Sequence, residues 1–128
     1  MYANPQVGVE DPLLYRHNYC LSLYFLGYDG CMDYAYQHSF GKHIWKDFDH
    51  HKYRDHVFAY PTSNGVVDTI QWEGFREAVD NVRYVHTCIQ NCDHSPTIFS
   101  EIKDHVHRKE LEEARHLLVK GIENCQAD

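Results

Sequence analysis

The sequence lacks the long apolar run of a membrane-spanning helix. No stretch approaches the roughly 18 consecutive apolar residues that a span requires. The first ten residues also lack the basic and apolar regions of a secretory signal peptide. We therefore expect no membrane partner. The localisation stays unknown, because a missing signal in a truncated product says nothing about its parent protein.

The sequence also lacks a surplus of basic residues. It carries 12 Lys and Arg against 19 Asp and Glu, which gives a formal net charge of −7 with histidine neutral. Nucleic acids and anionic membranes attract positive proteins, so we expect neither as a partner. Eleven histidines would reduce the negative charge as the pH falls through about 6.5.

The five cysteines form no regular framework. Their number is odd and no two have the CxxC spacing. Cys88 and Cys92 are four residues apart and would share one helix face. We expect small buried side chains with free thiols, and a metal or redox role remains the alternative. A glycine-rich phosphate loop is missing too, and no cofactor is expected.

The length excludes a complete eightfold barrel. A chain of 128 residues suffices for one small core, whereas eight βα units take about 250 residues. Apolar residues make up 43% of the chain and charged residues 24%, as in ordinary folded proteins. Any barrel interpretation must therefore concern a fragment.

Helix signals occur at three places. Asp11 followed by Pro12 predicts a helix start, and Gly27 predicts its end. Asp68 with Gln71 resembles a capping box, and apolar residues at three-to-four spacing continue that helix to about residue 89. Ser95-Pro96 predicts a last helical region to about residue 122, with a break near residues 107–109.

Two short segments are predicted strands. Residues 30–37, GCMDYAYQ, are nearly continuously apolar or aromatic, as in a strand buried on both faces. Residues 57–61, VFAYP, form a second strand, and the turn-rich TSNGVV after it reads as a connector. Residues 38–56 read as a long polar loop. Strands alternating with amphipathic helices predict an α/β fold with a parallel sheet.

Two stretches also resemble a known family. They are residues 30–37 and residues 60–85, the latter with Tyr60-Pro61, Gly65, Glu73 and Arg76-Glu77 followed by DNVRY. On these residues the chain resembles the last βα units of barrel proteins in the β-N-acetylgalactosaminidase-like glycoside hydrolase group. Two positions depart from the pattern: Ala78 replaces a usual glycine, and Asn81 replaces a common acid of a structural charge network.

The resemblance implies a C-terminal fragment of a TIM-type (β/α)8 barrel. About three βα units would occupy residues 1–92, and residues 93–128 would form a C-terminal helical extension. Hydrolysis in this group resembles substrate-assisted catalysis, in which the sugar's own acetamido oxygen attacks the anomeric carbon. The required acidic pair would lie upstream of Met1. We therefore assign no catalytic residue and expect this chain alone to be inactive.

The barrel interpretation places candidate sugar-binding residues at strand ends and in the following loops. Aromatic rings can stack on sugar faces, and amide or imidazole groups can bond hydroxyls. Ordinary packing remains the alternative for each tyrosine and for the tryptophan. The candidates are Asn4, Gln6, Tyr36, Gln37, His38, Tyr60 and, as a lid over the sugar, Trp45.

The loop at residues 38–56 invites a metal interpretation. Histidine and carboxylate side chains suit zinc, but their spacing here matches no defined motif, so we expect a hydrated loop and no metal ligand. The residues concerned are His38, His43, His50, His51, His56, Asp47, Asp49 and Asp55.

Three functions therefore stay open from the sequence. The first is a wall of the carbohydrate site of a glycoside hydrolase. The second is a non-catalytic carbohydrate-binding or protein-interaction module, and the third is a histidine-rich metal-binding protein. Open sheet edges in a three-strand piece would also favour self-association.

Overall fold

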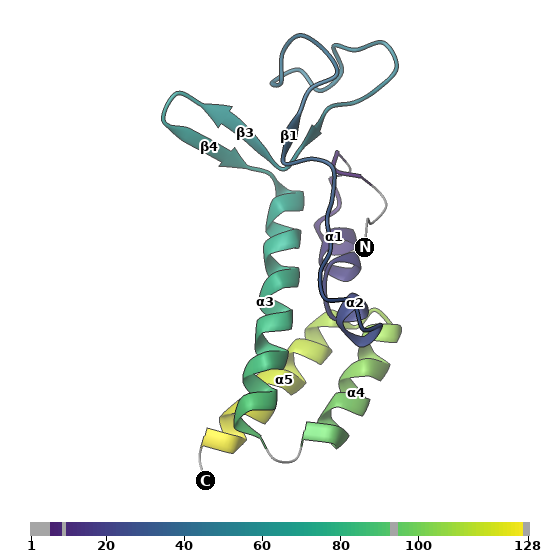
Figure 1. The fold of residues 1–128 in the computed structure, drawn as a ribbon, viewed down its shortest axis with the longest axis vertical. Helices are drawn as coiled ribbons and strands as arrows, with labels where there is room; N and C mark the ends of the chain where they lie inside the picture. The colour runs from purple at the N-terminus through teal and green to yellow at the C-terminus, as the bar shows by residue number, and fades with distance from the viewer. Residues whose placement is uncertain (1–5, 9, 93–94, 127–128) are drawn as a thin grey trace.

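The computed structural model describes residues 6–8, 10–92 and 95–126. The helices occupy one half of the molecule, and the short strands with the long loop project from its other end (Figure 1). We call these the helical half and the loop half. In this part of the chain, no helix is long and apolar enough to cross a membrane.

The first predicted helix is present but divided in two. Helix α1 spans Pro12–Asn18, and Asp11 caps it by accepting a hydrogen bond from the backbone N of Leu14 at 3.1 Å, as predicted. Helix α2 spans Leu21–Phe25 and is followed by Gly27 with a φ of 78°. The Ser22 hydroxyl donates to the carbonyl of His17 at 2.6 Å, which occupies an acceptor that a continuous helix would use.

The longer helices lie close to where the sequence predicts them. Helix α3 spans Ile70–Asn91, and Thr69, one residue after the predicted cap, accepts a hydrogen bond from Trp72 N. Helix α4 spans Ser95–His107 and α5 spans Leu111–Gln126. The predicted break between them is confirmed, with Lys109 in the left-handed region at a φ of 63°.

The strands contradict the barrel prediction. Strand β1 (Gln37–His38) pairs antiparallel with β2 (His56–Val57), and β3 (Ala59–Thr62) pairs antiparallel with β4 (Gly65–Asp68). A TIM-type barrel needs parallel strands joined by helices. The described residues contain two separate two-stranded sheets, so a barrel fragment with three βα units is wrong and only a loose α/β mixture remains.

The apolar segment at residues 30–37 explains most of this error. Only its last residue, Gln37, lies in a strand, and Met32 is 65% exposed. A strand buried on both faces needs layers on both sides to cover it. The helices pack against one another instead, so this run lies along them as an extended connection (Figure 1).

The connector predicted at residues 62–67 is also different in the structure. Its second half forms β4, which closes a hairpin with Thr62 opposite Gly65. Val66 and Val67 of β4 are about half exposed, at 48% and 50%. Self-association through sheet edges stays a prediction, as does the domain boundary near residue 92.

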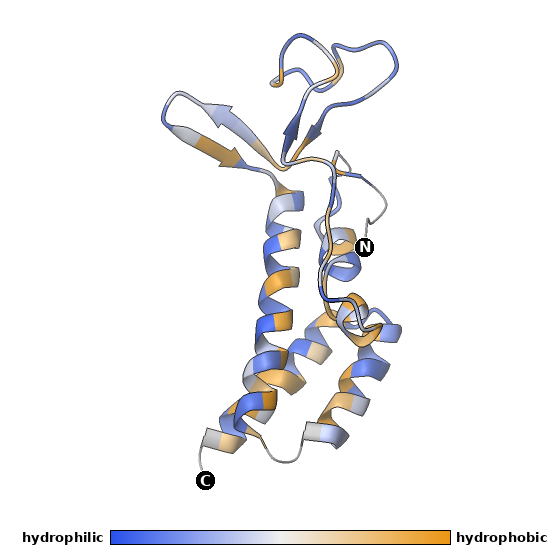
Figure 2. Ribbon diagram, viewed as in Figure 1, coloured by the Kyte–Doolittle hydropathy of each residue, from blue (hydrophilic) through white to orange (hydrophobic). Residues whose placement is uncertain are grey.

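The core lies where α1, α3, α4 and α5 meet. The helices turn their apolar sides toward one another, whereas the loop half is mostly hydrophilic (Figure 2). Gly74 permits the close crossing of α1 and α3, because a Cβ there would lie 2.2 Å from the Pro12 carbonyl oxygen. The largest fully buried apolar side chains are Tyr15, Leu21, Ile102, Leu118, Val7 and Val85.

A charge network and a disulfide connect the same helices. Arg115 of α5 donates to Glu77 at 2.7 Å and to Asn81 at 2.6 Å, both on α3. Arg16 of α1, only 5% exposed, pairs with Glu112 of α5 and lies 3.6 Å from Glu77. At the far end of α3, Cys92 is disulfide-bonded to Cys125, so these two are not the free thiols that the sequence predicts.

Candidate carbohydrate-binding surface

The loop at residues 39–55 contacts β3 through an aromatic ring pair. The Trp45 ring stacks on the Tyr60 ring, with 4.7 Å between centroids and 24° between planes. The Trp45 indole N–H donates to the Pro61 carbonyl at 2.9 Å. Trp45 nevertheless remains 55% exposed. The structure thus brings together two of the predicted candidates on one surface.

A group of charged side chains lies beside this ring pair. The Tyr60 hydroxyl donates to Asp47 Oδ1 at 2.5 Å, and Arg54 donates to Asp47 Oδ2 at 2.9 Å and to Glu10 Oε1 at 2.7 Å. Burial, followed by the bond to Asp47, raises the pKa of Tyr60 above its ordinary value, so its hydroxyl stays protonated and donates. The aromatic pair is therefore fixed by a carboxylate that is itself ion-paired.

The remaining candidates have structural partners. The Gln37 amide donates to the Ala59 carbonyl at 2.6 Å, which joins β1 to β3. His38 Nδ1 lies 3.1 Å from the Tyr34 hydroxyl, and its ring packs edge-on against Phe40 at 4.6 Å. Gln37 and His38 therefore use their side chains for contacts within the loop half.

Tyr36, Gln6 and Asn4 complete the set of predicted residues. Tyr36 is 48% exposed and places its ring edge against Trp72 at 5.7 Å, apart from the Trp45 pair. The backbone carbonyl of Gln6 accepts a hydrogen bond from the Tyr15 hydroxyl at 3.1 Å. Asn4 lies outside the described residues.

Sequence reasoning missed the three charged residues of this surface. Asp47 appears there only as one carboxylate of a hypothetical metal loop, and Arg54 and Glu10 are not singled out at all. The Arg54 guanidinium joins Glu10, 44 residues away, to Asp47. No local pattern reports a pairing over that distance. The seven-residue spacing of Asp47 and Arg54 inside a loop carries no periodicity either.

The histidines of the loop make ring contacts. His50 stacks on Tyr53 with 2° between planes and contacts His51 at 4.5 Å. His56 Nδ1 lies 3.1 Å from the Tyr34 carbonyl. Across the residues that the structure describes, no group of three or more His, Cys, Asp and Glu side chains is arranged to hold a metal ion. The metal hypothesis therefore gains no support from the geometry.

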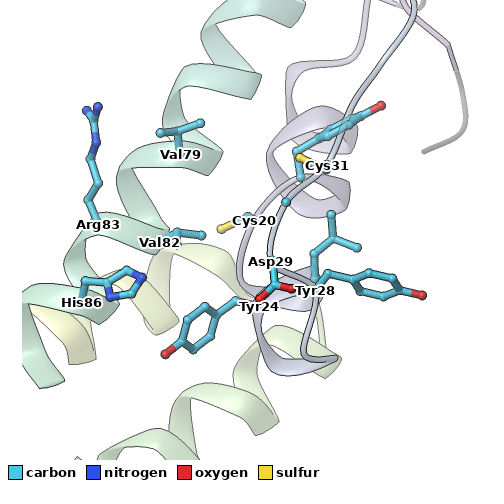
Figure 3. A pocket seen from close by; sticks show the side chains of 12 residues that line it. Cys20, Tyr24, Tyr28, Asp29, Cys31, Val79, Val82, Arg83 and His86 are labelled. Carbon is cyan, nitrogen blue, oxygen red and sulfur yellow. The ribbon is translucent and has the colours of Figure 1, made fainter. Parts of the chain in front are cut away.

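A hollow also lies in the helical half. It measures about 400 Å³, and its α3 wall carries Val79, Val82, Arg83 and His86 (Figure 3). Cys20 lines the opposite side, and burial raises the pKa of its thiol to about 11. A thiol that is protonated near neutral pH is a poor nucleophile. The Arg83 side chain is 75% exposed and pairs with Asp80 at 3.1 Å.

Comparison of the chain with protein-family models, with curated proteins and with solved structures finds no match.

Proposed function

We propose that this chain binds carbohydrate on the surface formed by Trp45 and Tyr60, and that it contributes binding without hydrolysis. The observation that carries the proposal is the exposed Trp45 ring, held in a stack by Tyr60 while more than half of its surface stays accessible, at 55%. An apolar ring face with polar groups beside it suits the mixed apolar and hydroxyl surface of a sugar.

Prior ordering of the ring supports this use. Tyr60 packs against one side of Trp45, and Pro61 accepts the indole hydrogen bond. Asp47 in turn fixes Tyr60 through its hydroxyl. A side chain that folding has already ordered loses little further entropy when a ligand arrives, which favours binding.

Polar groups around the ring offer hydrogen bonds to sugar hydroxyls. The side chains of Asp47, Arg54 and Glu10 are 14%, 28% and 61% exposed. A shallow hollow of about 550 Å³ lies beside the Trp45 ring, lined by Lys42, His43, Ile44, Trp45 and Lys46. Carboxylates accept and guanidinium groups donate, so both kinds of partner are present for hydroxyls.

The pairing of the carboxylates at this surface supports binding without hydrolysis. Glycoside hydrolysis requires an acid that can donate a proton to the leaving oxygen. Asp47 and Glu10 both accept hydrogen bonds from Arg54. Both carboxylates therefore already have a structural partner. The resemblance of the sequence to the β-N-acetylgalactosaminidase-like group makes an N-acetylated sugar the ligand to test.

Titration with N-acetylgalactosamine-containing oligosaccharides, followed by calorimetry, tests this proposal. We expect saturable heat with the unchanged chain and no turnover of a chromogenic N-acetylgalactosaminide. Trp45→Ala should weaken binding by about fivefold, because a stacked aromatic contact is worth about 1 kcal/mol.

Phe48→Ala is the matched control. Phe48 is an aromatic residue of the same loop, is 77% exposed, and packs against the Arg54 guanidinium. Its removal should leave the affinity nearly unchanged. Equal losses in both variants, or no binding by the unchanged chain, would refute the proposed surface.

A further inference from the structure

Three sulfur atoms converge where the ends of α3 and α5 meet. Cys92 and Cys125 form a disulfide that connects residues 33 apart in the sequence. Cys88, one helical turn before Cys92, places its thiol sulfur 3.8 Å from the Cys92 sulfur. This separation is van der Waals contact between a free thiol and one sulfur of a disulfide, which is the proximity that thiol–disulfide exchange requires.

We propose that Cys92 exchanges partners between Cys125 and Cys88. Burial raises the pKa of the Cys88 thiol, so the thiolate is a minor form and the exchange is slow. When it forms, the Cys88 thiolate attacks the Cys92 sulfur, a Cys88–Cys92 bond forms, and the Cys92–Cys125 bond breaks. Cys125 leaves as a thiolate and takes up the proton that Cys88 gave up. One disulfide and one thiol exist before and after the step, so the exchange needs no external oxidant or reductant.

The backbone around Cys92 permits the second pairing. Cys92 is the C-cap of α3 and has extended backbone angles, φ −125° and ψ 119°, whereas Cys88 lies within the helix. Residues four apart on a helix have Cα atoms about 6 Å apart, within the range of about 4.4–6.8 Å that disulfides span. Only the residue at the helix end has to adjust its backbone.

The exchange would move the free thiol from the interior to an accessible position. Cys88 is fully buried at 0% exposure, so thiols in solution cannot reach it. Cys125 is partly exposed, on the last turns of α5. The exchanged form therefore presents the Cys125 thiol to solvent in place of the buried Cys88 thiol, and Cys92 no longer connects α5 to α3.

The effect on the fold would be local. At the other end of the contact between α3 and α5, Arg115 still bonds Glu77 and Asn81. The core positions Ala114 and Leu118 of α5 are fully buried. The exchange should therefore loosen the last turns of α5 and leave its first turns in place.

Peptide mapping distinguishes the two pairings. The full chain is equilibrated for hours in a glutathione redox buffer, since uncatalysed disulfide rearrangement takes minutes to hours. It is then quenched in acid, denatured, alkylated with N-ethylmaleimide and digested with trypsin. Residues 84–103 carry both Cys88 and Cys92, and residues 121–128 carry Cys125. The original pairing gives the two peptides cross-linked, and the exchanged pairing gives an internal disulfide in residues 84–103 with Cys125 alkylated.

We expect both products from the unchanged chain, and we expect the alkylated Cys125 product to be lost in Cys88→Ser and in Cys88→Ala. Cys20→Ser is the control, because Cys20 is likewise a buried free thiol but is not part of the disulfide or of the Cys88 contact. It should leave both products unchanged. The proposal is overturned if the unchanged chain gives only the cross-linked peptides, if it forms no disulfide among these residues, or if Cys125 is alkylated equally in the Cys88 variants.

Discussion

The helical half and the loop half are held together by different interactions. In the helical half, buried apolar side chains such as Ile102 and Leu118 meet between helices, and ion pairs connect α1, α3 and α5 around them. In the loop half, individual hydrogen bonds from side chains to the backbone hold the chain in place. For example, Asp55 accepts a hydrogen bond from the Phe40 N–H at 2.8 Å. Burial stabilises cooperatively, whereas single hydrogen bonds contribute about 1 kcal/mol each.

This difference places the main source of stability in the helical half, and the proposed function places ligand binding in the loop half. The loop half leaves the Trp45 ring 55% exposed. Solvent-facing aromatic rings contribute little to the core but can contact a ligand. A change in the helical half should therefore alter global unfolding, and a change in the loop half should alter local order and binding.

The largest effect should come from Gly74→Ala. A methyl group there meets the Pro12 backbone of α1, with distances of 2.2–2.8 Å to its atoms. Backbone cannot move aside as a flexible side chain can, so we expect a loss of about 3 kcal/mol in the free energy of unfolding. Urea denaturation measures it. Gly30→Ala is the control, because no atom outside its chain neighbours lies within 4 Å of the added methyl. Equal stability of the two variants would contradict the close packing of α1 on α3.

A smaller effect is expected for Asp47→Asn in the loop half. The amide removes the negative charge that pairs with Arg54 and weakens the acceptor for the Tyr60 hydroxyl. We expect a loss of about 1 kcal/mol, confined to the loop. Hydrogen exchange should speed up at residues 39–55 and stay unchanged in α3 and α5. Faster exchange throughout the helices would show that the two halves unfold as one unit.

The smallest effect concerns Glu112 and acid. The hydrogen bond from Arg16 lowers the pKa of Glu112 below its ordinary value of 4.5. A lowered pKa in the folded state stabilises the fold above pH 4.5, and that contribution disappears as the pH falls below this value. Because the Glu112 side chain is 71% exposed, solvent screening limits the contribution to less than about 1 kcal/mol.

Glu112→Gln should therefore reduce the loss of stability between neutral pH and about pH 3, measured by urea denaturation at each pH. Glu113→Gln changes the neighbouring residue, which is exposed, and serves as the control. An unchanged pH dependence in the Glu112 variant would show that the pair with Arg16 contributes nothing to stability.

The helices could be predicted because their signals are local. Asp11 with Pro12 and the break near Lys109 act over one turn of backbone, and the structure has both. The strands could not be predicted in the same way. An apolar run such as residues 30–37 predicts burial. The element that buries it, however, depends on packing elsewhere in the chain.

The site was partly predictable for the same reason. Trp45 and Tyr60 attract notice as aromatic residues near predicted strand ends, and the structure stacks them. Their support by Asp47 and Arg54, the pairing of Arg54 with Glu10 and the pairing of Cys92 with Cys125 all depend on long-range contacts. The sequence alone contains no spacing that specifies these partners.

Hydrogen exchange with and without an N-acetylgalactosamine-containing oligosaccharide tests most directly whether the loop half, and not the helical half, binds the ligand. We predict that ligand slows exchange at residues 39–55 and in β3, around Trp45 and Tyr60, and leaves α3, α4 and α5 unchanged. Slower exchange centred on the hollow beside Cys20 and His86, or no change anywhere at saturating ligand, would contradict the assignment of recognition to the loop half.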